Sequence, residues 1–374
     1  MTIYLDYNAT SPVHPEVADL VYKMMVFEFG NAGSRTHEFG VEAKRAVELA
    51  RGKVANIVKA DKTEVIFTSG ATESNNIAIL GLQEYAVISR KNHIITTKIE
   101  HKSVLEPIEH LVNKGFEVTY LNVDENGQID VKELENALRD ETFLVSIMHI
   151  NNETGSVQPL EEASKILSSH DAYFHVDAAQ SFGKYPYDLD NPRIDLISAS
   201  GHKLYAPKGI GALIMRRRGF LKPPLKPIYF GGGQEKGLRP GTLAVPLIAG
   251  FGLACELAQK NALAWCEHAS LLKKELIRSL QSLDAKFIDK KTSPYVLNFS
   301  VPGVNSEAAM VMLKGIAAVS NGSACTSSSY TPSHVLLAMG LCQEQIAGSI
   351  RVSWSHQTTA VPSDEICRIM KGLL

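Results

Sequence analysis

The chain of 374 residues is poor in cysteine and carries almost no excess charge. Its five cysteines are odd in number and none forms a Cys-x-x-Cys pair, which argues against a disulfide framework and a structural zinc site. The histidines show no His-Glu-x-x-His spacing, so we expect no metal site. A net charge of −2 argues against direct binding of nucleic acid through a bulk field. The composition leaves room for one functional cysteine.

The sequence also lacks a long hydrophobic run. The longest, residues 244–255, contains Pro246 and two glycines and is shorter than the roughly 20 residues that span a bilayer. The first residues show no basic region followed by an apolar stretch, so we see no signal peptide. We therefore expect a soluble, cytoplasmic protein that does not contact a membrane.

What the chain does contain is a regular alternation of apolar runs with helical patterns. Several runs are continuous, as expected for strands covered on both faces. The repetition predicts an α/β fold with a mostly parallel, seven-stranded sheet. The length suggests about two domains, the larger over residues 14–254. The predicted strands lie at residues 65–67, 93–97, 116–121, 143–149, 173–176, 194–199 and 210–215.

The pattern changes near residue 255. A charged helix at about 256–283 leads to short strands at residues 295–301, 316–320 and 350–354. These features predict a smaller α+β domain formed by residues 255–374 and completed by residues 1–13. Near the start, a long helix is expected to be amphipathic through Val41, Ala46, Leu49 and Val54. The basic run 216–218 is interpreted as a solvated strand edge.

Candidate ligand-binding residues follow the predicted strands. In an open parallel sheet, ligands bind beyond the carboxyl ends of the strands. The first strand is followed by residues 68–73, which open directly into a helix, and such a turn suits a phosphate. An ordinary capped turn is the alternative. His101 and Asn152 follow later strands, and polar groups there either satisfy nearby backbone or hold a ligand.

Two further strand ends point to one cofactor. Asp177 ends an apolar strand, where a carboxylate needs a cation or several donors, and a protonated pyridine nitrogen would serve. Lys203 follows Ser200 and His202, a set suited to a small anion beside a nucleophilic amine. Our hypothesis is that Lys203 forms a Schiff base with pyridoxal 5'-phosphate (PLP). A solvated lysine after a buried strand is the alternative.

The C-terminal part adds a thiol and a buried cation. Cys325 lies in a glycine- and serine-rich stretch, which suits a mobile, partly exposed thiol, whereas Cys255 and Cys342 are expected to be buried. An inert loop cysteine is the alternative. Arg351 lies in an apolar strand and needs an anion, which a substrate carboxylate or an internal acidic residue would provide.

With these residues described, the chain resembles the PLP-dependent cysteine desulfurases of the NifS/IscS type, in the class V aminotransferase group. The resemblance runs nearly end to end and implies the fold of type I PLP-dependent transferases. The matching motifs occupy residues 4–10, 67–75, 97–102, 151–155, 175–180, 200–203, 241–242, 322–327 and 349–351.

The resemblance implies a role for each candidate residue. Lys203 would carry the cofactor, His101 would stack on its ring, Asp177 would pair with the ring nitrogen, and Gln180 would contact the phenolic oxygen. The residues implied to hold the phosphate are Ala71, Thr72, Ser200 and His202, helped by Thr242 from the partner subunit. Asn152 and Arg351 would bind the substrate carboxylate. The role of Thr242 implies a homodimer with composite active sites.

The implied reaction converts L-cysteine to L-alanine. The substrate would replace Lys203 on the cofactor, and the freed lysine would move protons at the substrate Cα. Cys325, as a thiolate, would attack the substrate sulfur and keep it as a persulfide for a sulfur-acceptor protein. A selenocysteine lyase or an aminotransferase is the alternative within PLP enzymes, and a non-catalytic sulfur carrier is a third reading.

The sequence departs from the family at Pro240 and in the residues after Arg351. Pro240 stands where family members have serine. The cysteine segment resembles the longer-loop branch of the family. Only residues 352–374 follow Arg351, so the tail with which housekeeping members engage an iron-sulfur scaffold is expected to be short or missing. A specialised acceptor, such as one for sulfur modification of DNA or tRNA, is therefore an alternative to the scaffold.

Overall fold

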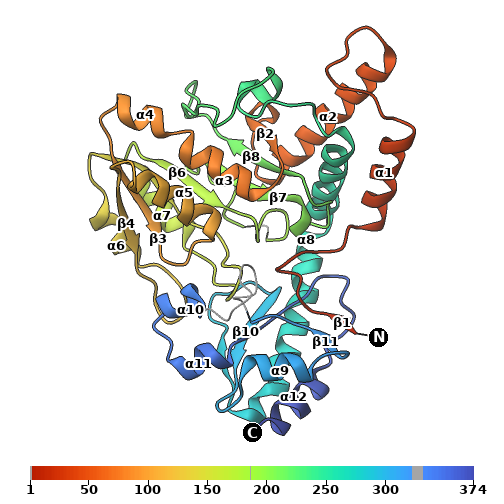
Figure 1. Cartoon of the computed structure of the whole chain (residues 1–374), viewed down its shortest axis with the longest axis vertical. Coiled ribbons are helices and arrows are strands. Elements are labelled where there is room, and N and C mark those ends of the chain that lie inside the picture. Colours follow the sequence, from red (N-terminus) through yellow and green to blue (C-terminus); the bar gives the residue numbers. More distant parts are fainter. Residues whose placement is uncertain (1, 186, 322–331) are drawn as a thin grey trace.

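A computed structural model describes residues 2–185, 187–321 and 332–374 of the chain. Figure 1 shows a large sheet with helices on both sides and, below it, a smaller group of short strands and helices. The long helix α8 runs from one group into the other. The strands are β1 (Ile3–Tyr4), β2 (Val65–Thr68), β3 (His93–Thr97), β4 (Glu117–Leu121), β5 (Thr142–Ser146), β6 (Tyr173–Asp177), β7 (Leu196–Ser200), β8 (Gly211–Met215), β9 (Lys286–Ile288), β10 (Val296–Ser300), β11 (Ala317–Ala318) and β12 (Ile350–Ser353).

The large sheet confirms the predicted fold class. Its seven strands lie in the order β2-β8-β7-β6-β5-β3-β4, and each corresponds to one of the seven apolar runs. Strand β8 is antiparallel to both of its neighbours, and the other pairs are parallel. The carboxyl ends of the six co-directional strands therefore meet at one edge, beside the start of β8.

The continuous apolar runs arise because both faces of this sheet are covered. Successive strand residues point to opposite faces. Val65 and Phe67 accordingly join one buried core, while Ile66 between them joins a second. Ile197 and Leu196 divide in the same way. Six of the seven strands are therefore buried at nearly every position and show no alternating pattern, whereas the edge strand β4 is partly exposed.

The helices divide between the same two cores. Residues of α3, α4 and α5 pack in the second core, and residues of α1, α2, α6, α7 and α8 pack in the first. Among the described residues, we find no helix long and apolar enough to cross a bilayer. The helices are α1 (Pro15–Val26), α2 (Glu38–Ile57), α3 (Ala71–Leu80), α4 (Gln83–Ile88), α5 (Lys102–Val112), α6 (Val131–Ala137), α7 (Leu160–Leu167), α8 (Val245–Leu280), α9 (Ser306–Met312), α10 (His334–Ala338), α11 (Gln343–Gly348) and α12 (Ser363–Gly372).

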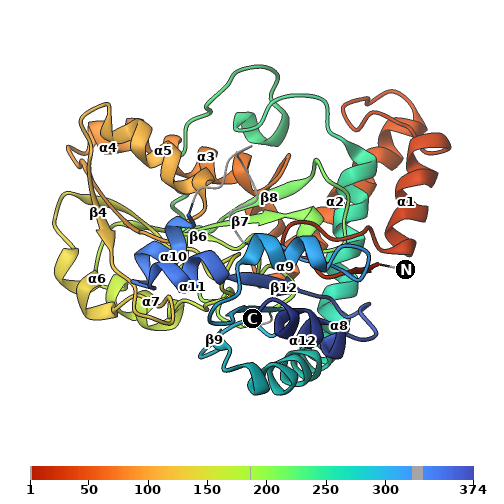
Figure 2. The same ribbon diagram turned by 60° about the horizontal axis from the view of Figure 1, so that its bottom comes forward.

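The smaller group is built on α8 and two short sheets. Strands β12-β10-β9 form an antiparallel sheet, and β1 pairs with β11 in parallel. Figure 2 brings this group forward and shows α12 beside α8. The apolar and charged segments on either side of residue 255 are two halves of the single helix α8. The pairing of β1 with β11 supports grouping residues 1–13 with residues 255–374, but the proposed boundary lies inside a continuous helix and stays a prediction.

Helix α2 forms as predicted, but its buried face was predicted wrongly. Val54 is buried, as are Ala43, Val47 and Ala50, whereas Val41 and Leu49 are exposed. The helix therefore carries apolar residues on two sides. One side packs against α8, and the other faces solvent in the single chain.

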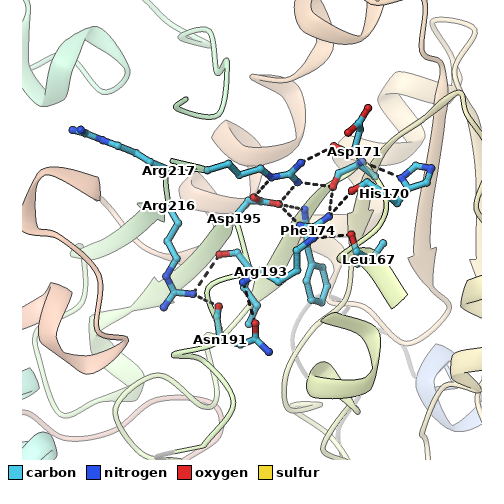
Figure 3. Close-up of polar contacts among 12 residues, drawn as sticks. Leu167, His170, Asp171, Phe174, Asn191, Arg193, Asp195, Arg216 and Arg217 are labelled. Atoms are coloured by element: carbon cyan, nitrogen blue, oxygen red, sulfur yellow. Dashed lines mark hydrogen bonds and ion pairs between the residues drawn. The ribbon is translucent and has the colours of Figure 1, made fainter. Parts of the chain in front are cut away.

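The basic run at residues 216–218 is not a solvated edge, except at Arg217. The Asp195 carboxylate, 1% exposed, pairs with Arg193 (Nη1···Oδ2 2.7 Å) and Arg218 (Nε···Oδ1 2.6 Å). Arg216 is buried and donates hydrogen bonds to four backbone carbonyls. Figure 3 shows this cluster, with Arg217 pointing away from it. Because a buried carboxylate and carbonyls accept from these guanidinium groups, charge can be buried here.

Candidate active site

A cavity of about 510 Å³ lies at the edge where the strand ends meet. Its walls come from the ends of β2, β6 and β7, the starts of α3 and α5, and parts of the N-terminal and C-terminal segments. Ten of the predicted site residues line it, namely Ala71, Thr72, His101, Asn152, Asp177, Gln180, Ser200, His202, Lys203 and Arg351. Thr242 is exposed and lies outside this cavity. Cys325 lies outside the described residues.

One end of the cavity is suited to an anion. Ala71 and Thr72 begin α3, whose first backbone N–H groups have no helical acceptor. The Ser200 hydroxyl lies across from this turn, 3.5 Å from where a Cβ on Gly70 would be. Lys208 also lines the cavity and supplies positive charge. These groups form a cradle into which an oxyanion would fit.

His202 lies beside this end as a neutral ring. Its Nδ1 is 3.1 Å from the Thr10 hydroxyl. Burial, together with the nearby ammonium groups of Lys203, Lys208 and Lys184, lowers the pKa of His202 to about 4. At neutral pH the imidazole can therefore donate or accept a hydrogen bond, but it adds no charge to the anion site.

Asp177 and His101 both line the cavity and come from two different elements. Asp177 ends β6 and is 4% exposed, and its carboxylate accepts from Asn75 Nδ2 (2.8 Å) and the Ala179 backbone N–H (2.9 Å). His101 caps α5, where its Nδ1 accepts from the Ser103 backbone N–H (3.1 Å). Burial lowers the pKa of His101, with the Asp177 carboxylate opposing that shift. The neutral ring therefore carries its proton on Nε2.

Lys203 lies beneath a segment from the start of the chain. We call residues 6–11 the N-terminal strap. Lys203 ends the 3₁₀ turn Gly201–Lys203 after β7, and its Nζ donates to the backbone carbonyls of Asn8 and, at 2.7 Å, Ala9. Gln180 Nε2 also donates to the Asn8 carbonyl, at 2.9 Å. The strap thus provides oxygen acceptors for the lysine amine.

Arg351 closes the other end of the cavity and already has an acidic partner. It lies on β12, is 2% exposed, and donates from Nη2 to Asp6 Oδ1 (2.7 Å) and from Nη1 to the Asn152 carbonyl (3.1 Å). Arg351 pairs with an internal acid, as one alternative predicted, and it also lines the cavity, as the other alternative, a substrate carboxylate, requires. Asn152 is tied to the strap as well, since its carbonyl accepts from Asn8 Nδ2 (3.0 Å).

A comparison with known protein families matches residues 3–363 of the chain to the family described as aminotransferase class-V. The chain belongs to this family. The match confirms the group to which the motifs pointed, and it covers both the large sheet and the C-terminal strands.

Relatives of this chain confirm its resemblance to the cysteine desulfurases of the NifS/IscS type. Cysteine desulfurase IscS of Colwellia psychrerythraea is 44% identical over 379 residues, covering 100% of this chain and 93% of that protein. A solved NifS-like protein has a TM-score of 0.89 at 37% identity, covering 100% and 98% of the two chains. The crystal structure of DndA from Streptomyces lividans has a TM-score of 0.82 at 49% identity, covering 93% and 98%.

The described residues that flank the Cys325 segment make contacts close to the cavity. On one side, Ser320 and Arg351 exchange backbone hydrogen bonds (3.1 and 2.6 Å). On the other, the Ser333 hydroxyl donates to the buried Glu153 carboxylate (2.5 Å), and the His334 ring lies 3.0 Å from the Glu100 carbonyl. The described residues on either side of positions 322–331 are therefore held close to Arg351 and to Glu100, the residue before His101.

The described cysteines give mixed results for the sequence predictions. Cys255 is buried as expected, and burial raises the pKa of its thiol. The expectation for Cys342 was wrong, because it caps α11 at the surface and is exposed.

Sequence reasoning missed several residues of this site. Asp6, Asn8 and Ala9 contact four of the predicted site residues, yet the motif at residues 4–10 gave no hint of their roles. Asn75, whose amide supports Asp177, was likewise quoted only within a motif. Lys208 looked like any lysine after a proline, and only the fold places it in the wall of the cavity.

Proposed function

We propose that this chain is a PLP-dependent cysteine desulfurase, which converts L-cysteine to L-alanine and passes the sulfur from Cys325 to an acceptor protein. The observation that carries the proposal is the single cavity that gathers a lysine, a buried carboxylate, a neutral histidine, an anion cradle and a buried arginine. Its membership of the class-V aminotransferases and its similarity to cysteine desulfurases support the same conclusion.

The residues of the cavity fit PLP. The turn at residues 69–72, Ser200 and Lys208 suit its phosphate, and Asp177 suits a protonated ring nitrogen. Gln180 has a buried Oε1 that lacks a hydrogen-bond partner among the described residues, which suits a hydroxyl donor on the ring. When bound, PLP would supply an electron sink that stabilises negative charge developing at the substrate Cα.

The side chains around it would orient and move protons. Lys203 would hold the cofactor covalently and, once the substrate takes its place, its amine would carry a proton at the substrate Cα. The carbonyls of Asn8 and Ala9 would stabilise that amine when it is protonated. Asn75 and the Ala179 N–H keep the Asp177 carboxylate oriented. Asn152 and Arg351 would bind the substrate carboxylate.

The sulfur step needs no outside oxidant. The thiolate of Cys325 attacks the sulfur of L-cysteine, so that a sulfur–sulfur bond forms as the carbon–sulfur bond breaks. The electron pair of the broken bond stays with the substrate carbon, which takes up a proton and leaves as alanine. The contacts of the flanking residues support this role, because Ser320 pairs with Arg351, which lines the cavity, and Ser333 donates to the buried Glu153.

We infer that the functional unit is a homodimer. The exposed side of α1 and α2 presents Tyr22, Phe27, Phe39 and Leu49, all more than half exposed. Thr242 lies outside the cavity of its own chain, as a residue acting in a partner subunit would. Apolar patches of this kind mark contact surfaces.

The proposal is tested with two variants and a matched control. Cys325→Ala should lower alanine and sulfide formation from L-cysteine by about a thousandfold or more while leaving the yellow colour of bound PLP. Lys203→Ala should lose the stable visible absorption after free cofactor is removed. Cys342→Ala removes an exposed cysteine on α11 and should retain activity.

Unimpaired turnover in Cys325→Ala would overturn the role of that thiol. Amino exchange with a keto acid, independent of Cys325, would identify an aminotransferase instead. An unchanged visible spectrum in Lys203→Ala would refute the assignment of the cofactor lysine. Trapping the persulfide of Cys325 with candidate acceptors would then identify the partner.

A further inference from the structure

The pairing of Arg351 with Asp6 is unusual for an arginine expected to bind a substrate. Arg351 is almost fully buried, and one of its two terminal nitrogens is committed to the Asp6 carboxylate at 2.7 Å. Its other terminal nitrogen donates to the Asn152 carbonyl, and its Nε has no hydrogen-bond partner within the described parts of the chain. Thus the guanidinium is neutralised by the protein itself but not fully hydrogen-bonded.

Asp6 is held firmly beside this arginine. It forms a parallel bridge with Ser353, two residues after Arg351 on the same strand. The Ser353 N–H donates to the Leu5 carbonyl (2.8 Å), and the Tyr7 N–H donates to the Ser353 carbonyl (3.4 Å). The side chain of Asp6 is only about a fifth exposed. Its position is therefore set by backbone pairing, independently of the ion pair.

The other polar and charged residues near Arg351 do not replace Asp6 as the partner of its guanidinium. Glu153 is buried and feels the charge of Arg351, but its carboxylate accepts from the Ser333 hydroxyl. Tyr4 donates its hydroxyl proton to the backbone carbonyls of Asp6 and Thr10. Lys203 carries charge of the same sign as Arg351. Asp6 is consequently the acid that directly compensates the guanidinium.

We propose that Asp6 is the resident counter-ion of Arg351, whose place a ligand carboxylate takes when it binds. The inference rests on the proposed function, in which Arg351 binds the substrate carboxylate. Asp6 is then a positioning residue: it compensates and orients the arginine between turnovers, and substrate binding exchanges one carboxylate for another. The orphaned Nε supplies the additional donor that an incoming carboxylate would gain.

This arrangement sets the affinity for carboxylates. A buried charge without a partner is costly, so compensation by Asp6 lowers what a ligand gains by pairing with Arg351. Asp6→Asn keeps the shape and removes the charge, which leaves the ligand as the only counter-ion. The variant should therefore bind carboxylate ligands more tightly, whereas a purely structural role for Asp6 would not change acid affinity selectively.

The test compares two ligands that differ in charge alone. 3-Mercaptopropionate carries a carboxylate, and 3-mercaptopropionamide is its neutral counterpart. Calorimetry on the cofactor-loaded protein gives both dissociation constants without turnover. For Asp6→Asn we expect the acid to bind at least about tenfold more tightly and the amide to be little changed. Asp6→Glu, which keeps the charge, should resemble the native protein.

Further variants distinguish the counter-ion role of Asp6 from its premise, which is that Arg351 binds the substrate carboxylate. Glu106→Gln removes one negative charge from the exposed side of α5 and should alter neither ligand selectively. Arg351→Gln should lose the preference for the acid. If it does while Asp6→Asn shows no selective gain, the counter-ion role is overturned and the role of Arg351 stands. If Arg351→Gln still prefers the acid over the amide, the carboxylate-binding role of Arg351 and the counter-ion role of Asp6 are both overturned. Should Asp6→Asn not fold, Asp6→Ser replaces it, with the same expected gain.

Discussion

Glu100 is a buried acid that the chemistry of the site does not use directly. It precedes His101, is fully buried, and its Oε1 accepts from the Met148 N–H (2.7 Å) and the Thr97 hydroxyl (2.9 Å). Its Oε2 has no hydrogen-bond partner in the described structure. Burial raises the pKa of Glu100 to about 8, and the Asp177 carboxylate adds to the rise. At neutral pH the folded protein therefore holds Glu100 as the neutral acid.

Glu100→Gln should flatten the dependence of stability on pH. Because the folded-state pKa lies above the unfolded value, protonation of Glu100 stabilises the fold fully below about pH 4.5. That stabilisation is lost as pH rises through about 8. Glutamine mimics the neutral acid, so the variant should gain roughly 2–4 kcal/mol over the native protein above pH 8.

Urea unfolding at pH 6 and pH 9 measures this difference. Glu106→Gln, on the exposed side of α5, is the matched control and should keep the native pH slope. A Glu100→Gln variant that loses stability between the two pH values as steeply as the native protein would contradict the raised pKa.

At the residue scale, the sequence predicted those site residues that end or follow strands. Asp177, Ser200 and Lys203 are brought together because parallel strands present their carboxyl ends at one edge. The sequence could not predict Asp6 or Asn8, because their partners lie 144 to 345 positions away and no local pattern records such contacts. The buried Lys184, whose pKa burial lowers to about 7, gave no signal either.

At the element scale, the turn from β2 into α3 depends on close packing against β8. Gly211 begins β8 opposite Thr68, at the base of the anion cradle. A Cβ on Gly211 would lie 2.6 Å from Gly70 Cα and would also meet the Ala199 carbonyl oxygen. All of these obstacles are backbone atoms, so they cannot rotate away.

Gly211→Ala should therefore displace the turn that we propose to hold the phosphate. We expect PLP to bind at least about tenfold more weakly, with a loss of about 1–3 kcal/mol in unfolding free energy from overpacking. Titration of the visible absorption with PLP measures the first effect, and urea unfolding measures the second. Gly52→Ala in α2, where a Cβ would meet no atom within 4 Å, is the control. Native PLP affinity in Gly211→Ala would show that the turn does not depend on this contact.

The elements of the large sheet could be predicted more fully than those of the smaller group. Six strands of the large sheet are buried along nearly their whole length, because helices cover both faces, and only the edge strand β4 is partly exposed. Strand β9 was missed, since three residues beginning with an exposed lysine form no pattern. The prediction divided helix α8 at residue 255, where its sequence changes from apolar to charged. The helix does not end there, and its buried residues continue to Leu280 in the same core.

At the scale of the whole molecule, one side of α1 and α2 exposes apolar side chains that the described part of the chain does not cover. Phe39 stacks on Phe29 with ring centroids 5.6 Å apart, and both rings are more than half exposed. Phe39 and Leu49 also line a surface cavity of about 480 Å³ with residues of α1. Such apolar area is expected to be covered by a second subunit. The sequence predicted the dimer only through the family, because the error over the face of α2 hid this surface.

Phe39→Glu combined with Leu49→Glu should separate the subunits. Charges in an apolar contact cannot be desolvated without partners, and loss of a central aromatic residue weakens an interface by about 2 kcal/mol or more. If Thr242 completes the phosphate site of the partner, the monomer should also bind PLP more weakly. Sedimentation velocity gives the mass, and absorption titration gives the affinity. Val87→Glu on α4, at an exposed apolar position in a different part of the surface, should leave both unchanged. A dimer that persists would refute this interface, and a monomer with native PLP affinity would refute the composite site.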